Sequence, residues 1–211
     1  MNKKGFFITI EGPEGAGKST QCKMLCGYLE ALGFECVWTR EPGGTPVAEK
    51  LRDIVKYSKE NISEEAELLL FNAARALHVA NLIRPAVERG AIVICDRFAD
   101  STTAYQGYGR ELNLEEVKNI NSYAVGNCVP DLTLVLDLDQ KSGFGRVKKR
   151  NHASIADDRF ENAGSSFHDK VRDGFLKIAE LEPERVKIIE ASGSPECVHV
   201  LIREKVDDLI K

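Results

Sequence analysis

The sequence predicts an α/β fold in which five parallel strands form a central sheet and helices cover both of its faces. Short runs rich in β-branched and aromatic residues alternate with longer helical patterns along the chain. Several of these runs, such as residues 91–95, are apolar nearly throughout, as a strand covered on both faces requires. A GxxxxGK[ST] motif also follows the first run directly and precedes a helix-like stretch. Together these observations predict a three-layer sandwich.

The elements can be placed in order along the chain. We expect the strands at residues 6–11, 35–39, 91–96, 132–138 and 186–190. Helix starts are signalled by Ser63 before two glutamates, by Asn113 with Glu116 three residues on, and by Ser194 followed by Pro195, while Gly90 signals a helix end. With 211 residues, no internal repeat and no low-complexity linker, residues 1–211 are expected to form one domain.

Composition excludes several classes of function. The chain has 29 Lys plus Arg against 33 Asp plus Glu, a formal net charge of -4, so we expect no nucleic-acid partner and infer that local groups must meet any anionic ligand. No apolar run approaches the roughly 18 residues of a membrane span, and the start shows no cleavable signal pattern, which predicts no membrane association and a cytoplasmic location. The six cysteines form no CxxC pair, which argues against metal and disulfide roles.

The glycine-rich motif predicts a nucleotide-phosphate site. It comprises Gly12, Pro13, Glu14, Gly15, Ala16, Gly17, Lys18 and Ser19, with Thr20 next in the helix-like stretch. The glycines let backbone N–H groups converge on phosphate oxygens, Lys18 reaches the terminal phosphates and Ser19 can ligate Mg²⁺. An ordinary strand-to-helix turn needs neither a lysine nor a hydroxyl there. The chain lacks the N/TKxD segment that GTPases use, which favours ATP.

Residues just after the other strands indicate what receives the phosphate, because ligands of open α/β sheets lie beyond the carboxyl ends of strands. Arg40 and Arg97 follow two different strands, and paired guanidiniums can clamp a phosphate monoester, although either alone could form a surface salt bridge. Asp96 could anchor Mg²⁺ or cap a helix. Phe71 and Arg75 share a helix face, so a ring could stack on a base whose edge the guanidinium bonds. The apolar run beside Phe71 by itself favours a core position for this residue.

These segments, in the same order and spacing, resemble the thymidylate kinase family. The resemblance rests on the phosphate loop and on the REPGGT (residues 40–45), FxxAR (71–75) and DRxxxSxxAYQ (96–106) signatures. It implies the P-loop nucleoside-monophosphate kinase fold, a fixed turn at Pro42, and transfer of phosphate from ATP with Mg²⁺ to dTMP, giving dTDP for dTTP synthesis. It also implies a homodimer, for which an apolar helix at residues 64–88 could supply the interface. The implied substrate residues are Glu14 at the 3′-hydroxyl, Arg40 and Arg97 at the phosphate, Phe71, Arg75, Thr102 and Gln106 at the base, Tyr105 in the space of a 2′-hydroxyl, and Ser101 within the third signature.

A lid is expected at about residues 143–161. A phosphate oxygen is already anionic, so transfer needs alignment and charge neutralisation rather than a base, and we expect the four histidines only at surface or packing positions. Some thymidylate kinases carry a basic residue at the position of Gly15, whereas others place arginines in the lid, and this chain resembles the second kind. Arg146 and Arg150 are therefore expected to act with Lys18 and Arg97 in catalysis, although a solvated basic helix face would also explain the basic run at 146–150.

Two other functions remain open from the sequence. Another nucleoside-monophosphate kinase would share the loop, fold and mechanism but accept a different base. A nucleotide-dependent regulator would instead hydrolyse ATP without any response to a nucleoside monophosphate.

Overall fold

The structure is a computed structural model that describes residues 5–139, 142–143, 145–146, 159–160 and 164–211. Its centre is a five-stranded sheet in the order β2-β3-β1-β4-β5, and each neighbouring pair of strands is parallel. The strands are β1 (Phe7–Glu11), β2 (Cys36–Arg40), β3 (Ile92–Asp96), β4 (Leu132–Asp137) and β5 (Val186–Glu190). The predicted parallel sheet is confirmed, with each strand within one residue of its expected bounds.

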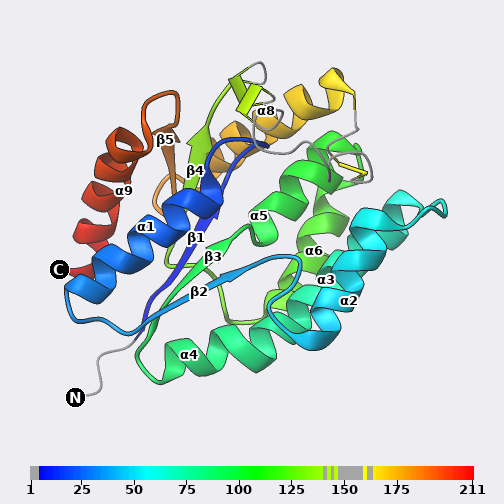
Figure 1. Cartoon of the computed structure of the whole chain (residues 1–211). Helices are drawn as coiled ribbons and strands as arrows, with labels where there is room; N and C mark the ends of the chain where they lie inside the picture. The colour runs from blue at the N-terminus through cyan, green and yellow to red at the C-terminus, as the bar shows by residue number, and fades with distance from the viewer. Residues whose placement is uncertain (1–4, 140–141, 144, 147–158, 161–163) are drawn as a thin grey trace.

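Helices cover both faces of the sheet (Figure 1). On one face, α1 (Lys18–Ala31) and α9 (Pro195–Ile210) bury Leu25, Leu29 and Ile202 against Ile8 and Ile10 of β1. The opposite face is covered by η1 (Val79–Ile83), α4 (Arg84–Glu88) and α8 (Ser165–Leu181). The remaining helices, α2 (Pro46–Tyr57), α3 (Glu64–His78), α5 (Ala99–Thr102), η2 (Thr103–Gly109) and α6 (Leu114–Val125), extend that second layer. The three-layer prediction is therefore confirmed.

Local capping chemistry explains where several helices begin. The Ser63 side chain accepts from the backbone N–H of Ala66, Asn113 Oδ1 accepts from two N–H groups of α6, and Ser194 Oγ accepts from Cys197 N. Each bond satisfies a donor that the first helical turn leaves without an intrahelical partner. All three predicted helix starts are confirmed.

The sheet topology brings the motif-bearing loops to one edge. β1 lies between β3 and β4, and β2 lies beside β3, with Arg40 in register with Asp96 and Ile10 in register with the same residue. The loops that follow β1, β2 and β3 therefore leave the sheet side by side, in the position where open α/β sheets bind ligands. Among the helices of the described residues, none is both long enough and apolar enough to cross a membrane.

Candidate active site

A pocket opens where the carboxyl ends of β1, β2 and β3 meet α2, α3, α5 and η2. Among the described residues that line it, six are basic and three are acidic, although the whole chain has a net charge of -4. The basic residues are Lys18, Arg40, Arg52, Lys56, Arg75 and Arg97, and the acidic ones are Glu14, Glu41 and Asp96. This local excess of positive charge suits an anionic ligand, as the overall composition required.

The phosphate loop leads from β1 into α1 without interruption. Gly15 and Gly17 have φ angles of 74° and 95°, in the left-handed region that glycine adopts without strain. The Lys18 ammonium, which is almost fully buried, donates to Gly12 O at 3.1 Å and Pro13 O at 2.8 Å. Burial and the nearby Arg97 charge lower the pKa of Lys18 to about 8, an effect that the Glu14 carboxylate partly offsets. The lysine is thus held over the loop where phosphate would lie.

Ser19 and Asp96 meet at the floor of the pocket. The Ser19 hydroxyl donates to Asp96 Oδ2 at 2.5 Å and so joins the first turn of α1 to the end of β3. Asp96 therefore serves α1 rather than capping the helix after it, since α5 has Phe98 at its N-cap. A hydroxyl and a carboxylate side by side are oxygen donors of the kind that Mg²⁺ prefers.

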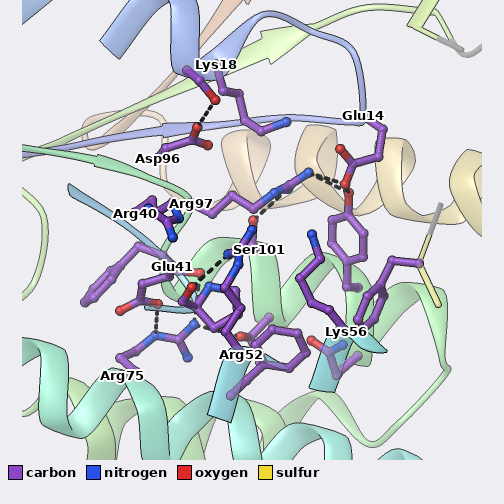
Figure 2. Close-up of a pocket in the computed structure, with 18 of the residues that line it drawn as sticks. Glu14, Lys18, Arg40, Glu41, Arg52, Lys56, Arg75, Asp96, Arg97 and Ser101 are labelled. Atoms are coloured by element: carbon purple, nitrogen blue, oxygen red, sulfur yellow. Dashed lines mark hydrogen bonds and ion pairs between the residues drawn. The ribbon is translucent and has the colours of Figure 1, made fainter. Parts of the chain in front are cut away.

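Arg97 lies at the centre of the pocket. Its Nη1 donates to Gly12 O and Ser101 Oγ, both at 3.1 Å. Its Nη2 donates to Tyr105 OH at 3.0 Å and to Glu14 Oε1 at 2.7 Å, and Figure 2 shows the guanidinium between Glu14 and Ser101. Its φ of 71° is unusual for a residue other than glycine and costs on the order of 1–3 kcal/mol. The contacts around the guanidinium hold this strained conformation in place, a pattern that is common at functional sites.

The Glu14 carboxylate partly neutralises the positive charge of the pocket. Burial raises the pKa of this carboxyl, but the positive charges of Arg97, Lys18 and Lys56 outweigh burial and lower its pKa to about 2. The carboxylate also accepts a hydrogen bond from Tyr105 OH at 3.2 Å. Glu14 thus stays charged throughout the neutral range and balances the cations around it.

The second predicted guanidinium, Arg40, lines the same pocket but is far more exposed. It pairs with Glu49 of α2 at 2.9 Å, and the two side chains are 52% and 40% exposed. Two further cations line this wall and were not predicted from the sequence. They are Arg52 and Lys56, which lie four residues apart on α2 and therefore share a face. That spacing, directly after the REPGGT segment, was the signal available in the sequence.

Arg75 is 1% exposed and anchors the other end of the pocket. Within the described structure, all five of its N–H groups donate to protein oxygens: Nε to Glu41, Nη1 to Asn72 and Asn121, and Nη2 to Phe98 O and Thr102 Oγ1. Phe71 lies one turn earlier on α3. It packs against an apolar cluster and also lines the pocket, with its ring centroid 5.7 Å from that of Phe160.

The third signature supplies the rest of the wall. Ser101, Thr102, Tyr105 and Gln106 all lie on α5 and η2, and all line the pocket. Tyr105 stands between Arg97 and Phe160, with its hydroxyl on Arg97 and its ring centroid 6.2 Å from that of Phe160. Gln106 is 1% exposed and donates through Nε2 to Glu67 Oε1 of α3 at 2.9 Å.

Three buried residues support the site from behind, and sequence reasoning gave them no such role. Glu11 accepts from Phe98 N at 2.7 Å and from the Ser101 hydroxyl, and burial, followed by the Asp100 charge, raises the pKa of Glu11 to about 7. Glu41 bonds Arg75 and also His78 Nδ1 at 3.0 Å.

His78 is fully buried, with its other ring nitrogen 2.8 Å from Thr39 Oγ1. It therefore belongs to the polar network behind the pocket, which goes beyond the packing role that we expected. Its spacing was the available signal, because it lies seven residues after Phe71 on the face that carries Arg75. The Glu41–Pro42 peptide bond in this network is cis.

Only part of the predicted lid falls within the described residues. Arg146 donates to Ala191 O at 3.0 Å and Ser192 O at 3.2 Å, across a second hollow that Gly15, Gly17 and Thr20 also line. Arg150 lies outside the described residues, and so does most of the segment at 143–161. The backbone of Gly143 packs so closely on the phosphate loop that a Cβ on Gly15 would overlap it.

Comparisons with known proteins agree with the motifs. The family model described as thymidylate kinase matches residues 10–202. The thymidylate kinase of Dehalococcoides mccartyi is 51% identical over 206 residues, covering 97% of each chain, and that of Syntrophotalea carbinolica is 49% identical over 192 residues, covering 90% of this chain and 89% of the other. The crystal structure of thymidylate kinase from Ehrlichia chaffeensis superimposes with a TM-score of 0.77 at 33% identity, covering 96% of this chain and 98% of that one. This chain belongs to the thymidylate kinase family.

Proposed function

We propose that this chain transfers the γ-phosphoryl group of ATP to dTMP, giving dTDP and ADP. The observation that carries the proposal is the pocket centred on Arg97, which joins the phosphate loop to the acceptor residues of the third signature. A phosphate oxygen of dTMP attacks the γ-phosphorus, and the bond from that phosphorus to the β–γ bridging oxygen breaks. The acceptor oxygen is already anionic, so the residues need only align the groups and neutralise charge.

The two ends of the pocket suit the two ends of dTMP. Arg97, with Arg40 at the more exposed rim, would bind the monophosphate, and Lys18 would face the phosphates of ATP. At the other end, Phe71 would stack on thymine while Thr102 and Gln106 read its edge, and Arg75, whose five N–H groups are taken by protein oxygens, would hold Thr102 in place from behind. Between the two ends, Glu14 would bond the 3′-hydroxyl and Tyr105 would occupy the space of a 2′-hydroxyl.

A magnesium ion fits the donor set at the loop. Ser19 Oγ and Asp96 Oδ2 already lie 2.5 Å apart at the start of α1, and both are hard oxygen donors. They would hold the ion directly or through water, with nucleotide oxygens completing its shell. Bound there, magnesium would neutralise part of the charge on the transferred phosphoryl group.

The lid arginines Arg146 and Arg150 are proposed to act in the transition state. The phosphate loop carries Gly15 and thus no arginine of its own, so charge beyond Lys18 and magnesium would come from the lid. The proposal is supported by the second hollow, which Arg146 lines together with Gly15 and Gly17. Replacing each arginine by alanine should lower kcat, whereas a loss confined to the ATP dissociation constant would assign the lid to binding alone.

A coupled assay of ADP formation tests the proposed reaction. With ATP and magnesium, dTMP should give the highest kcat/KM among dTMP, dUMP, dCMP, dGMP, dAMP and UMP. A different preferred base would point to another nucleoside-monophosphate kinase. ATP hydrolysis that does not respond to any of the six would favour the nucleotide-dependent regulator.

A homodimer in the cytoplasm is also proposed. The exposed apolar side chains of Leu69 on α3 and Tyr123 on α6, two helices in contact, offer surface for a two-fold interface. Light scattering after size exclusion should give twice the 23.4 kDa chain mass, and Leu69→Glu should shift it to the monomer. All six cysteines are free thiols, which suits a reducing compartment.

A further inference from the structure

Gln106 can present only its oxygen to the pocket, because Glu67 holds its nitrogen. Gln106 Nε2 donates to Glu67 Oε1 at 2.9 Å, and Glu67, which is 1% exposed, faces Arg110 at 3.3 Å and Arg159 at 3.5 Å. A carboxylate paired with guanidiniums only accepts hydrogen bonds, so the amide group of Gln106 cannot turn over without losing its bond. Within the described residues nothing bonds Gln106 Oε1, and Gln106 lines the pocket. An acceptor is therefore fixed at the base end.

Thr102, one turn earlier, can present only a hydrogen-bond donor to the pocket. Its Oγ1 accepts from Arg75 Nη2 at 2.8 Å, and a guanidinium has no lone pair with which to accept in return. The hydroxyl proton of Thr102 must then donate elsewhere. No acceptor for it occurs in the part of the chain that the structure describes, and Thr102 also lines the pocket. A donor and an acceptor from neighbouring helical turns thus line the same pocket, and a buried charged residue sets the direction of each.

The edge of thymine matches this pair, and the edge of cytosine opposes it. Thymine and uracil present a carbonyl acceptor beside an N–H donor, whereas cytosine presents an amino donor beside a bare ring nitrogen. We propose that Glu67 is a specificity-determining residue, which holds the Gln106 amide so that the site accepts pyrimidines with a carbonyl–imino edge and rejects those with an amino group. The inference rests on the proposed function, since it assumes that Thr102 and Gln106 read the base. A pocket built to hydrogen-bond one pattern leaves buried polar groups unpaired when it meets the other.

A purely structural role for Glu67 makes a different prediction. Glu67 also ties η2 and Arg159 to α3, so its loss could loosen the pocket in general. Loosening would lower the efficiency for every pyrimidine monophosphate alike. If the Gln106 amide were free to turn over, the catalytic efficiency for dCMP would instead change relative to that for dTMP. The efficiency for dUMP relative to dTMP would stay the same, because these two bases share the same hydrogen-bonding edge. The ratio between substrates therefore separates the two roles.

The test is Glu67→Gln, an isosteric change that lets residue 67 either donate or accept. With ATP saturating, kcat/KM is measured for dTMP, dUMP and dCMP, and the inhibition constant of dCMP against dTMP serves where its turnover is too slow. The preference for dTMP over dCMP should fall by about 10-fold or more, the gain or loss of one aligned buried hydrogen bond. The preference for dTMP over dUMP should change by less than about twofold. Glu64→Gln, an exposed change in the same helical turn, is the matched control and should alter neither ratio.

A double-mutant cycle with Gln106→Met tests whether Glu67 affects the base preference through Gln106. In that background the acceptor is already gone, so adding Glu67→Gln should change the dTMP-to-dCMP preference by less than about twofold. A folded Glu67→Gln variant with the wild-type preference, or with equal losses for all three substrates, would overturn the proposal. If Glu67→Gln does not fold, the Gln106→Met variant provides the test. A wild-type preference for dTMP over dCMP in that variant would also overturn the proposal. If Gln106→Met leaves both kcat and KM for dTMP unchanged, the assignment of the base site itself is wrong.

Discussion

The charge of Glu14 should stabilise the folded chain by an amount that depends on pH. Glu14 is held by Arg97 at 2.7 Å and by Tyr105 at 3.2 Å, and its pKa is lowered from 4.5 to about 2 because the charges of Arg97, Lys18 and Lys56 outweigh the cost of burial. At about 1.4 kcal/mol per pKa unit, this difference corresponds to about 3 kcal/mol at neutral pH. A group whose pKa is depressed by folding contributes stability above its unfolded pKa, and that contribution is lost as pH falls through its folded pKa. The contribution of Glu14 should therefore be constant above about pH 5.5 and decrease to about 1.4 kcal/mol at pH 3.

Glu14→Gln removes the charge but keeps an oxygen that Arg97 and Tyr105 can still reach. Its free energy of unfolding in urea, measured without ligand, should be lower than that of the wild type by about 2–3 kcal/mol at pH 7. The difference in unfolding free energy between the wild type and the variant should decrease as the pH is lowered from 5.5 to 3. Glu35→Gln provides the control, because the Arg89–Glu35 pair is 49% and 57% exposed and should contribute at most about 1 kcal/mol. A loss no larger than that of Glu35→Gln, or one that does not change with pH, would refute the reasoning from the charges of the pocket.

Four further outcomes are expected. Lys18→Ala should lower kcat by about 10³-fold or more with little change in the unfolding midpoint, because the ammonium is proposed to bind phosphate rather than to stabilise the fold; near-normal turnover would contradict that proposal. Because burial and the Arg97 charge lower the pKa of Lys18 to about 8, kcat/KM for ATP should fall as pH rises past 8, and Lys18→Arg should remove that alkaline limb. Arg75→Met should cost about 3–5 kcal/mol of unfolding free energy by leaving Glu41 buried and without its guanidinium, so a loss under 1 kcal/mol would count against the buried pair. Loss of one methyl group from an apolar pocket weakens transition-state binding by about 1–3 kcal/mol, so dUMP should be a poorer substrate than dTMP but not an inactive one. Comparison of kcat/KM for the two substrates checks this.

The fold was predictable because its signals are local. An apolar run such as residues 91–95 identifies a buried strand without any knowledge of its neighbours, and Ser63 or Asn113 identifies a helix start from two or three adjacent residues. The positions of the loops followed from a rule of topology, since parallel strands bring their carboxyl ends to one edge of the sheet. These inferences required only periodicity, caps and one topological rule.

The polar network behind the site was not predictable in this way. Glu41 meets Arg75 across 34 residues of sequence, Gln106 meets Glu67 across 39, and Ser101 meets Glu11 across 90. Nothing in the local pattern shows which carboxylate will be buried beside which guanidinium, because that depends on how α3 and η2 pack on each other. Glutamates at the start of a helix, such as Glu67, are usually solvated, and only the packed structure shows that this one is buried.

Two arginines of the pocket, Arg40 and Arg75, differ in the free energy that it would cost to move them. Arg40 pairs with Glu49 at the exposed rim, where an ion pair contributes at most about 1 kcal/mol, so its guanidinium can exchange that carboxylate for a phosphate with little loss. Arg75 pairs with Glu41 in the interior, where removing one partner costs about 3–5 kcal/mol, so its guanidinium stays fixed. An exchangeable guanidinium suits a phosphate that must arrive and leave in every cycle. A fixed guanidinium suits the proposed base end, where discrimination would require the Thr102 hydroxyl to keep the same direction from one turnover to the next.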